Sequence, residues 1–161
     1  MSATQRTKGA SGEREIATIV RDLTGWDVRR RIRQHDGDSD LEGVPGWSVE
    51  VKRHRSASCG DIAAWWRQTV DQAERAAALP VLFFRVDRDA WRAVWPLALF
   101  LTHQDAGYWK AYGWTAEGAI EAWAAAAREI RRDRQPTTDS PMRTLPDIET
   151  PSHPSLKGRT A

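Results

Sequence analysis

The chain of 161 residues has one cysteine, Cys59, only four lysines and no asparagine. A single cysteine excludes an internal disulfide and a cysteine-based zinc finger, and it is typical of proteins in a reducing compartment. No apolar run approaches the ~18 residues of a membrane-spanning helix, and the polar first residues lack the apolar core of a secretory signal. We therefore expect a cytoplasmic protein without membrane contact.

The sequence also has no glycine-rich phosphate loop of the type G-X4-G-K-[ST], so it predicts no nucleotide cofactor. A net charge of +2 is too small to indicate a polyanionic partner. The positive charge is nevertheless concentrated in two clusters, which could contact DNA phosphates or could form solvated basic surface. The clusters are Arg29, Arg30, Arg31 and Arg33, and Lys52, Arg53, His54 and Arg55.

Apolar periodicity predicts one α/β domain over residues 11–134, after a flexible lead over 1–10. Five of the eight prolines fall in residues 135–161, which we interpret as a disordered tail. The expected elements are helices over 12–24 and 61–79 and strands over 26–33, 47–52, 81–84 and 91–95. Beyond this core of about 11–95, residues 96–134 are expected to form a helical appendage, with helices over 97–105 and 116–132.

The segment Asp40-X9-Glu50-Val51-Lys52 is the most informative part of the sequence. Side chains alternate along a strand, so Glu50 and Lys52 project from the same face. Asp40 precedes a Gly-Val-Pro-Gly turn that would return the chain beside Glu50. We therefore expect two carboxylates and an ammonium group to meet at one end of the sheet.

This combination suits hydrolysis of a phosphodiester, in which an anionic nucleophile attacks an anionic phosphate. Carboxylate oxygens bind Mg²⁺ or Mn²⁺, and the bound ion activates water. Asp40, Glu50 and the backbone carbonyl of Val51 would hold the metal ion. Lys52 would orient the water or stabilise the charge that develops at phosphorus.

The same residues resemble the PD-(D/E)XK nuclease motif, with Ser39 where the motif usually has proline. The segment Lys8–Glu15 resembles the start of archaeal-type Holliday junction resolvases. The two resemblances together cover about residues 8–95 and imply a restriction-endonuclease-like fold, with a mixed central sheet flanked by helices. They also imply a homodimer that cuts branched DNA with a divalent metal ion, in a bacterial or phage-infected cell.

The resemblance adds two residues to the candidate site. It implies that Glu13, or less favourably Glu15, is a further catalytic metal ligand from the first helix. It also implies that a glutamine of the following helix holds the water or a phosphate, with Gln68 preferred over Gln72. An exposed Trp65 or Trp66 would suit the subunit interface.

Each of these residues also has a purely structural interpretation. Glu50 and Lys52 could form an ion pair on an edge strand, and Asp40 could only cap a turn. Glu13 could complement the N-terminal end of the helix dipole, and Gln68 could be an ordinary helix-surface residue. Asp36 and Asp38 fit a turn around Gly37 better than a metal site.

The alternatives at the level of function are of three kinds. Another nuclease of the superfamily would act on flaps, ends or duplex DNA. A DNA-binding module of the same fold would bind without cleavage. An interaction protein built around the tryptophan-rich surface would leave the acidic and basic motif unexplained. Dependence on a divalent metal ion separates the first from the other two.

Overall fold

The computed structural model describes residues 3–32, 38–100 and 110–134. The elements follow in the order α1 (Ala3–Thr24), β1 (Arg29–Arg30), β2 (Leu41–Glu42), β3 (Trp47–His54), α2 (Cys59–Arg75), β4 (Leu79–Val86), β5 (Arg92–Pro96), η1 (Leu97–Phe100), η3 (Tyr112–Trp114), β6 (Thr115–Ala119) and α3 (Ile120–Arg134). Among the helices of these segments, none is long and apolar enough to cross a membrane.

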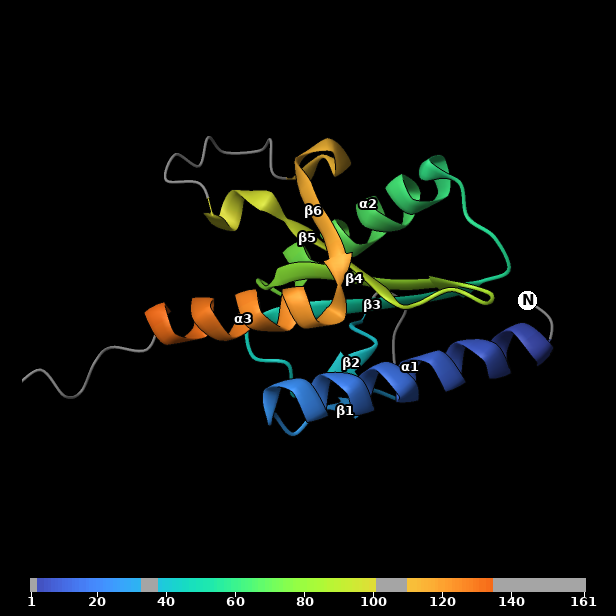
Figure 1. Cartoon of the computed structure of the whole chain (residues 1–161), viewed down its shortest axis with the longest axis horizontal. Coiled ribbons are helices and arrows are strands. Elements are labelled where there is room, and N and C mark those ends of the chain that lie inside the picture. The colour runs from blue at the N-terminus through green and yellow to red at the C-terminus, as the bar shows by residue number, and fades with distance from the viewer. Residues whose placement is uncertain (1–2, 33–37, 101–109, 135–161) are drawn as a thin grey trace, which may run out of the picture.

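Four strands form one mixed sheet in the order β3-β4-β5-β6. β3 and β4 are parallel and are joined through α2, because a parallel pair needs a crossover connection. The β4–β5 and β5–β6 pairs are antiparallel. α2 covers one face of the sheet, and α1 and α3 lie on the other (Figure 1). The predicted fold class, a mixed sheet flanked by helices with a helical C-terminal part, is confirmed.

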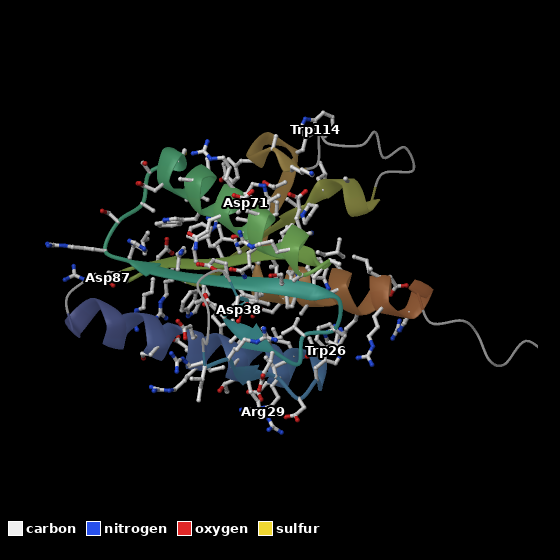
Figure 2. The ribbon with its side chains drawn as sticks, turned by 180° about the vertical axis from the view of Figure 1, so that it is seen from behind. Trp26, Arg29, Asp38, Asp71, Asp87 and Trp114 are labelled. Carbon is white, nitrogen blue, oxygen red and sulfur yellow. The ribbon has the colours of Figure 1, made fainter. Side chains whose placement is uncertain are left out.

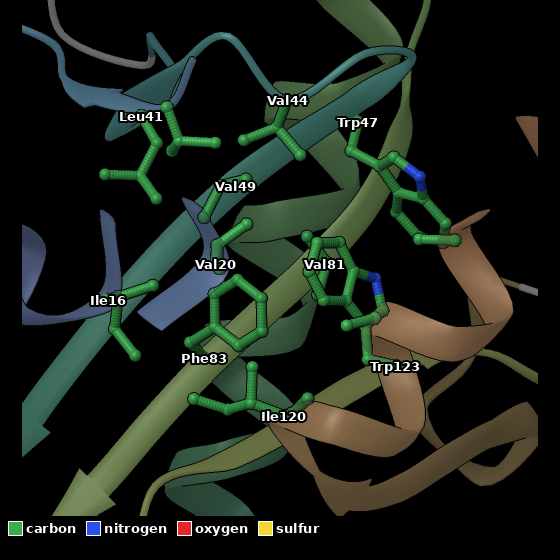
Figure 3. Close-up of a cluster of buried hydrophobic side chains, with 14 of the residues drawn as sticks. Ile16, Val20, Leu41, Val44, Trp47, Val49, Val81, Phe83, Ile120 and Trp123 are labelled. Atoms are coloured by element: carbon green, nitrogen blue, oxygen red, sulfur yellow. The ribbon is translucent and has the colours of Figure 1, made fainter. Parts of the chain in front are cut away.

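The main core lies between the sheet and the helices α1 and α3 (Figure 3). Its centre is Trp123 of α3, whose ring meets those of Trp47 and Phe83 edge-on at centroid distances of 5.5 and 4.9 Å. A smaller cluster around Trp66 and Leu82 fills the space under α2. The predicted buried strand is confirmed, because β4 contributes alternate residues to both clusters and therefore has an apolar side chain at each position from 81 to 84.

The first helix begins much earlier than the sequence indicated. α1 starts at Ala3, so the predicted flexible lead is mostly helical. Gly12 lies well inside this helix, where it allows close packing. A β-carbon at Gly12 would lie 3.2 Å from the ring of Trp91. Glu13 therefore stands in the middle of the helix and cannot complement the dipole at the first turn.

The second helix ends earlier than predicted. α2 stops at Arg75, and Ala77 then takes a left-handed conformation with φ of 48°. The N–H groups of Ala77 and Ala78 donate to the carbonyls of Glu74 and Ala73, which is the hydrogen-bond pattern of a Schellman motif. Pro80 lies inside β4.

Two further elements differ from the sequence prediction. The strand expected over 26–33 is reduced to the two residues of β1, because β2 offers only a two-residue partner. The helix expected from Ala116 begins at Ile120, since Thr115–Ala119 forms β6 and pairs with β5. Most of the helix expected over 97–105 and the whole tail from 135 lie outside the described residues.

The turn between β2 and β3 brings Asp40 to the sheet. Gly43 and Gly46 both have positive φ, of 79° and 77°. A β-carbon at Gly43 would lie 2.0 Å from the carbonyl oxygen of Asp27, so only glycine fits there. The turn thus needs glycine for its conformation and for its close approach to the segment before β1.

Candidate active site

Alternation along β3 gives its two faces different surroundings. Trp47, Val49 and Val51 belong to the main core. The residues between them project toward α2, where Ser48 meets Gln72 and Glu50 meets Gln68. The predicted assignment of residues to the two faces of this strand is therefore confirmed.

Asp40 binds the free edge of β3 with its backbone and its side chain. Its N–H donates to the carbonyl of Val49 over 2.8 Å, and its carboxylate oxygen Oδ2 accepts the N–H of Val51, also over 2.8 Å. The Ser39 hydroxyl accepts the N–H of Val49 over 2.9 Å. Since the N–H and C=O of one strand residue point to the same edge, the Val51 carbonyl faces the side on which Asp40 lies.

Glu50 is only 1% exposed, although it is a carboxylate. Its oxygen Oε1 accepts hydrogen bonds from Lys52 Nζ over 2.5 Å and from Gln68 Nε2 over 3.1 Å. Its other oxygen, Oε2, is buried and has no hydrogen-bond partner in the described part of the chain. A buried carboxylate oxygen without a donor is costly unless a positive group binds it.

Gln68 connects the two members of this pair. Its amide oxygen accepts a hydrogen bond from Lys52 Nζ over 3.1 Å while its amide nitrogen donates to Glu50. Gln72, the less favoured glutamine, instead binds Ser48 Oγ and the carbonyl of Val49 and is buried. The preference for Gln68 remains a prediction, and its contacts support it.

The two acids of α1 are engaged elsewhere. Glu13 forms an ion pair with Arg30 over 2.5 Å, and Glu15 forms two hydrogen bonds with Arg85. Within the described residues, no three acidic, histidine or cysteine side chains are grouped closely enough to hold a metal ion. The structure thus joins Glu50, Lys52 and Gln68 by hydrogen bonds and holds Asp40 on the backbone of Val51, between Glu50 and Lys52. It does not add Glu13 to a cluster of carboxylates.

Oε2 of Glu50, which has no hydrogen-bond donor among the described residues, shows whether the site suits a metal ion. A divalent cation bound there would supply the missing positive partner, and Asp40 and the Val51 carbonyl offer the hard oxygen ligands that Mg²⁺ prefers. The residues present therefore fit such an ion with two carboxylates and one carbonyl. Only the third carboxylate expected from the sequence is missing.

The basic clusters separate in space. Arg29 pairs with Asp27 at the outer surface, away from β3 (Figure 2), and Arg30 is held by Glu13. The β-carbon of Arg53 lies 3.6 Å from the position that a Gly12 β-carbon would take, so its side chain starts on the α1 side of β3, opposite Lys52. Arg55 is exposed beyond the strand. Arg33 and Asp36 lie outside the described residues.

A cleft of about 450 Å³ lies at the start of β3, between the β2–β3 turn and the end of α2, and it is not lined by Asp40, Glu50, Lys52 or Gln68. Its walls include Ser39, Gln72 and two arginines, Arg31 and Arg75. Arg75 was missed by the sequence analysis because it is an isolated cation at a helix end, and only the fold brings it to the same cleft as Arg31. Asp38 also lines this cleft.

The mixed α/β fold, with Asp40 bound to the edge of the strand that carries Glu50-Val51-Lys52, is that of the PD-(D/E)XK nuclease class. More specifically, the chain belongs to a family described as phage putative PDDEXK endonuclease, whose model matches residues 4–120. Among solved structures, the chain is similar to Hjc, a Holliday junction resolvase from Archaeoglobus fulgidus. Identity is 17% and the TM-score 0.39, over 73% of this chain and 88% of the other. No curated protein matches the sequence.

Proposed function

We propose that this protein is a metal-dependent DNA endonuclease whose active centre is Asp40, Glu50, Lys52 and Gln68. The observation that carries the proposal is the buried carboxylate of Glu50. One of its oxygens is bound by Lys52 and Gln68, and the other has no hydrogen-bond partner among the described residues. Structural stability alone gives no reason to bury such a group, whereas a bound cation does.

Asp40, Glu50 and the Val51 carbonyl would hold Mg²⁺ or Mn²⁺. When bound, the ion would lower the pKa of a water molecule and polarise the phosphodiester. Lys52 would keep a positive charge beside the phosphate as charge develops on its oxygens. Gln68, bonded to both Glu50 and Lys52, would fix the direction of the ammonium group.

Glu13 is a supporting residue in this proposal. Its carboxylate holds Arg30, and the pair is only partly exposed, at 12% for Glu13 and 33% for Arg30. Glu13 would become a metal ligand only by leaving this arginine. We therefore expect Glu13→Gln to reduce cleavage less than substitutions of Asp40 or Glu50.

DNA would be held by cations that flank the centre. Arg31 and Arg75 in the cleft, with Arg55 beyond β3, would contact backbone phosphates, which position DNA without reading its sequence. Arg29, Arg30 and Arg53 are less suited, because the first two hold acids and the third starts on the opposite side of β3. A role for Arg33 and for His54 in phosphate binding stays a prediction from the sequence.

The first substrate to test is branched DNA, cut by a homodimer. This part rests on the resemblance of residues 8–15 to archaeal-type resolvases, in which two sites act on one junction. Trp66 cannot form the interface because it is fully buried and donates to the Lys110 carbonyl. Size-exclusion chromatography with light scattering would give the mass of the particle, and a monomer at assay concentration would remove the homodimer from the proposal.

The decisive experiment incubates the purified protein with a labelled four-way junction and a linear duplex of the same sequence, in Mg²⁺, Mn²⁺ or EDTA. Asp40→Ala and Glu50→Gln test the centre. Glu42→Gln is the matched control, because Glu42 is an exposed carboxylate two residues after Asp40.

Cleavage that needs metal, survives Glu42→Gln and is lost in both other variants would support the endonuclease. Paired symmetric cuts in the junction alone would add branched specificity, and equal cutting of both substrates would remove it. Binding without cleavage in either metal would contradict the enzyme and favour the DNA-binding module.

A further inference from the structure

The face of β3 that meets α2 forms one continuous row of contacts. Ser48 meets Gln72, Glu50 meets Gln68, and His54 meets Trp65 at the end of the strand. The row starts buried, at Ser48 and Glu50, and ends at the exposed His54. Of the pair Glu50 and Lys52, only Lys52, whose side chain is 19% exposed, reaches solvent, and it lies on the same face of the strand as His54.

Three aromatic rings follow one another from the core to the surface at this end, with successive ring planes tilted by 51° and 34°. Phe84, in the buried strand β4, lies beneath Trp65 at a centroid distance of 6.3 Å. Trp65 in turn carries the His54 ring at 4.5 Å, with 34° between the planes. The backbone of His54 is fixed as well, because its carbonyl accepts the N–H of Asp87. The outermost ring is thus held in place from behind.

A fixed, exposed ring is a stacking surface for another flat group. In DNA that group is a nucleobase, and stacking on aromatic side chains tolerates every base because each has a π face. His54 stands two residues after Lys52, about 7 Å further along the strand. That separation places the ring beside the nucleotide next to the bond under attack.

We propose that His54, supported by Trp65, stacks on an unpaired base next to the scissile phosphodiester. Bases in an intact duplex have both faces covered by their neighbours, so this contact requires a gap, a flap, an end or a branch point. The inference rests on the proposed endonuclease and narrows its substrate class to DNA with an unstacked base at the cut. The phosphate contact predicted for His54 from the sequence is the competing interpretation.

Binding without cleavage gives the clearest test. Fluorescence anisotropy in EDTA would compare a labelled duplex that contains a short single-stranded gap with the same duplex fully paired. His54→Ala is expected to weaken binding to the gapped DNA roughly fivefold to 150-fold and to leave the paired duplex unchanged. His54→Phe is expected to retain the wild-type affinity, because it keeps a flat ring and removes the imidazole.

Trp114→Ala is the control, since this tryptophan is 44% exposed and lies away from Asp87 and the end of β3 (Figure 2). It is expected to bind both DNAs as the wild type does. Thermal unfolding of each variant would exclude loss of structure. Equal affinity of His54→Ala and wild type for gapped DNA would overturn the stacking, as would a His54→Phe variant as weak as His54→Ala, which would indicate an imidazole–phosphate contact.

Parallel cleavage assays in Mg²⁺ and Mn²⁺ keep the two proposals apart. Cleavage by wild type together with unchanged binding by His54→Ala would refute the stacking and leave the endonuclease standing. Ring-dependent binding of gapped DNA without cleavage in either metal would refute the endonuclease and retain the stacking surface.

Discussion

Removal of the Lys52 charge would measure how much this cation contributes to the free energy of unfolding. Lys52 Nζ lies 2.5 Å from Glu50 Oε1, and the side chains of Lys52 and Glu50 are 19% and 1% exposed. Lys52→Met would keep the aliphatic stem and leave a buried carboxylate with only the Gln68 amide as donor. The expected loss of stability lies between that of an exposed pair and that of a broken buried pair, at about 2–4 kcal/mol.

Urea unfolding of wild type, Lys52→Met, Glu50→Gln and the double variant would measure this directly. Glu50→Gln is expected to cost less than Lys52→Met, because the partly exposed ammonium group can reach water. The double variant should recover most of the loss, with a coupling energy of about 2 kcal/mol. Mg²⁺ should narrow the gap between Lys52→Met and wild type, because a cation at Glu50 Oε2 replaces the lost charge.

A loss below about 0.5 kcal/mol for Lys52→Met would refute the argument, since that is the range of a solvent-screened surface pair. The same conclusion would follow if the double variant were as unstable as the sum of the two single ones. Lys52→Arg serves as the control, because it keeps the charge and changes the geometry.

The remaining predictions concern neighbouring contacts. Gln68→Ala should slow cleavage with little change in the free energy of unfolding. Gln72→Ala should lower that free energy by about 1–3 kcal/mol, because it leaves buried partners unsatisfied. Cleavage kinetics and urea unfolding distinguish the two effects. Ser58→Ala should remove the capping box of α2 and cost about 1 kcal/mol by thermal unfolding. Burial and the hydrogen bond to Glu117 raise the pKa of Tyr112 to about 12. This tyrosine should therefore stabilise the fold below pH 10 and lose that contribution as the pH rises toward 12. Absorbance at 295 nm would measure its titration, and unfolding at each pH would measure the stability. Titration near pH 10 would contradict the Tyr112 environment.

The parts of the fold that could be predicted are those in which one residue pattern has one physical meaning. Alternation over Trp47–Lys52 requires a strand with two different faces, and the apolar run after Pro80 fits only a strand buried on both faces. The candidate pair Glu50 and Lys52 followed from that alternation. The position of Asp40 followed from the glycine turn, whereas the close approach of Gly43 to Asp27 arises only in the folded chain and has no local sequence signal.

Elements fixed by distant partners could not be predicted. Thr115–Ala119 contains alanine and glutamate, which favour a helix, but this segment pairs with the edge of β5 and therefore forms a strand. Gly12 resembled part of a helix start, and only the position of Trp91 explains why a residue without a side chain is needed there. In both cases the deciding contact joins residues far apart in the sequence.

The acids of α1 show the same limit within the site. Glu13 and Glu15 lie two residues apart on a helix, so they point in different directions, and each meets a different arginine from a distant strand. A sequence pattern can identify an acid at the right distance from a motif, but it cannot identify the cation that competes for it. Arg30 holds Glu13 with a full charge at 2.5 Å. A metal ion must therefore displace a bound guanidinium to gain this ligand, whereas at Glu50 it meets a buried oxygen without a partner among the described residues. We therefore expect Glu50 and Asp40, and not the acids of α1, to contribute most of the binding free energy of the metal ion.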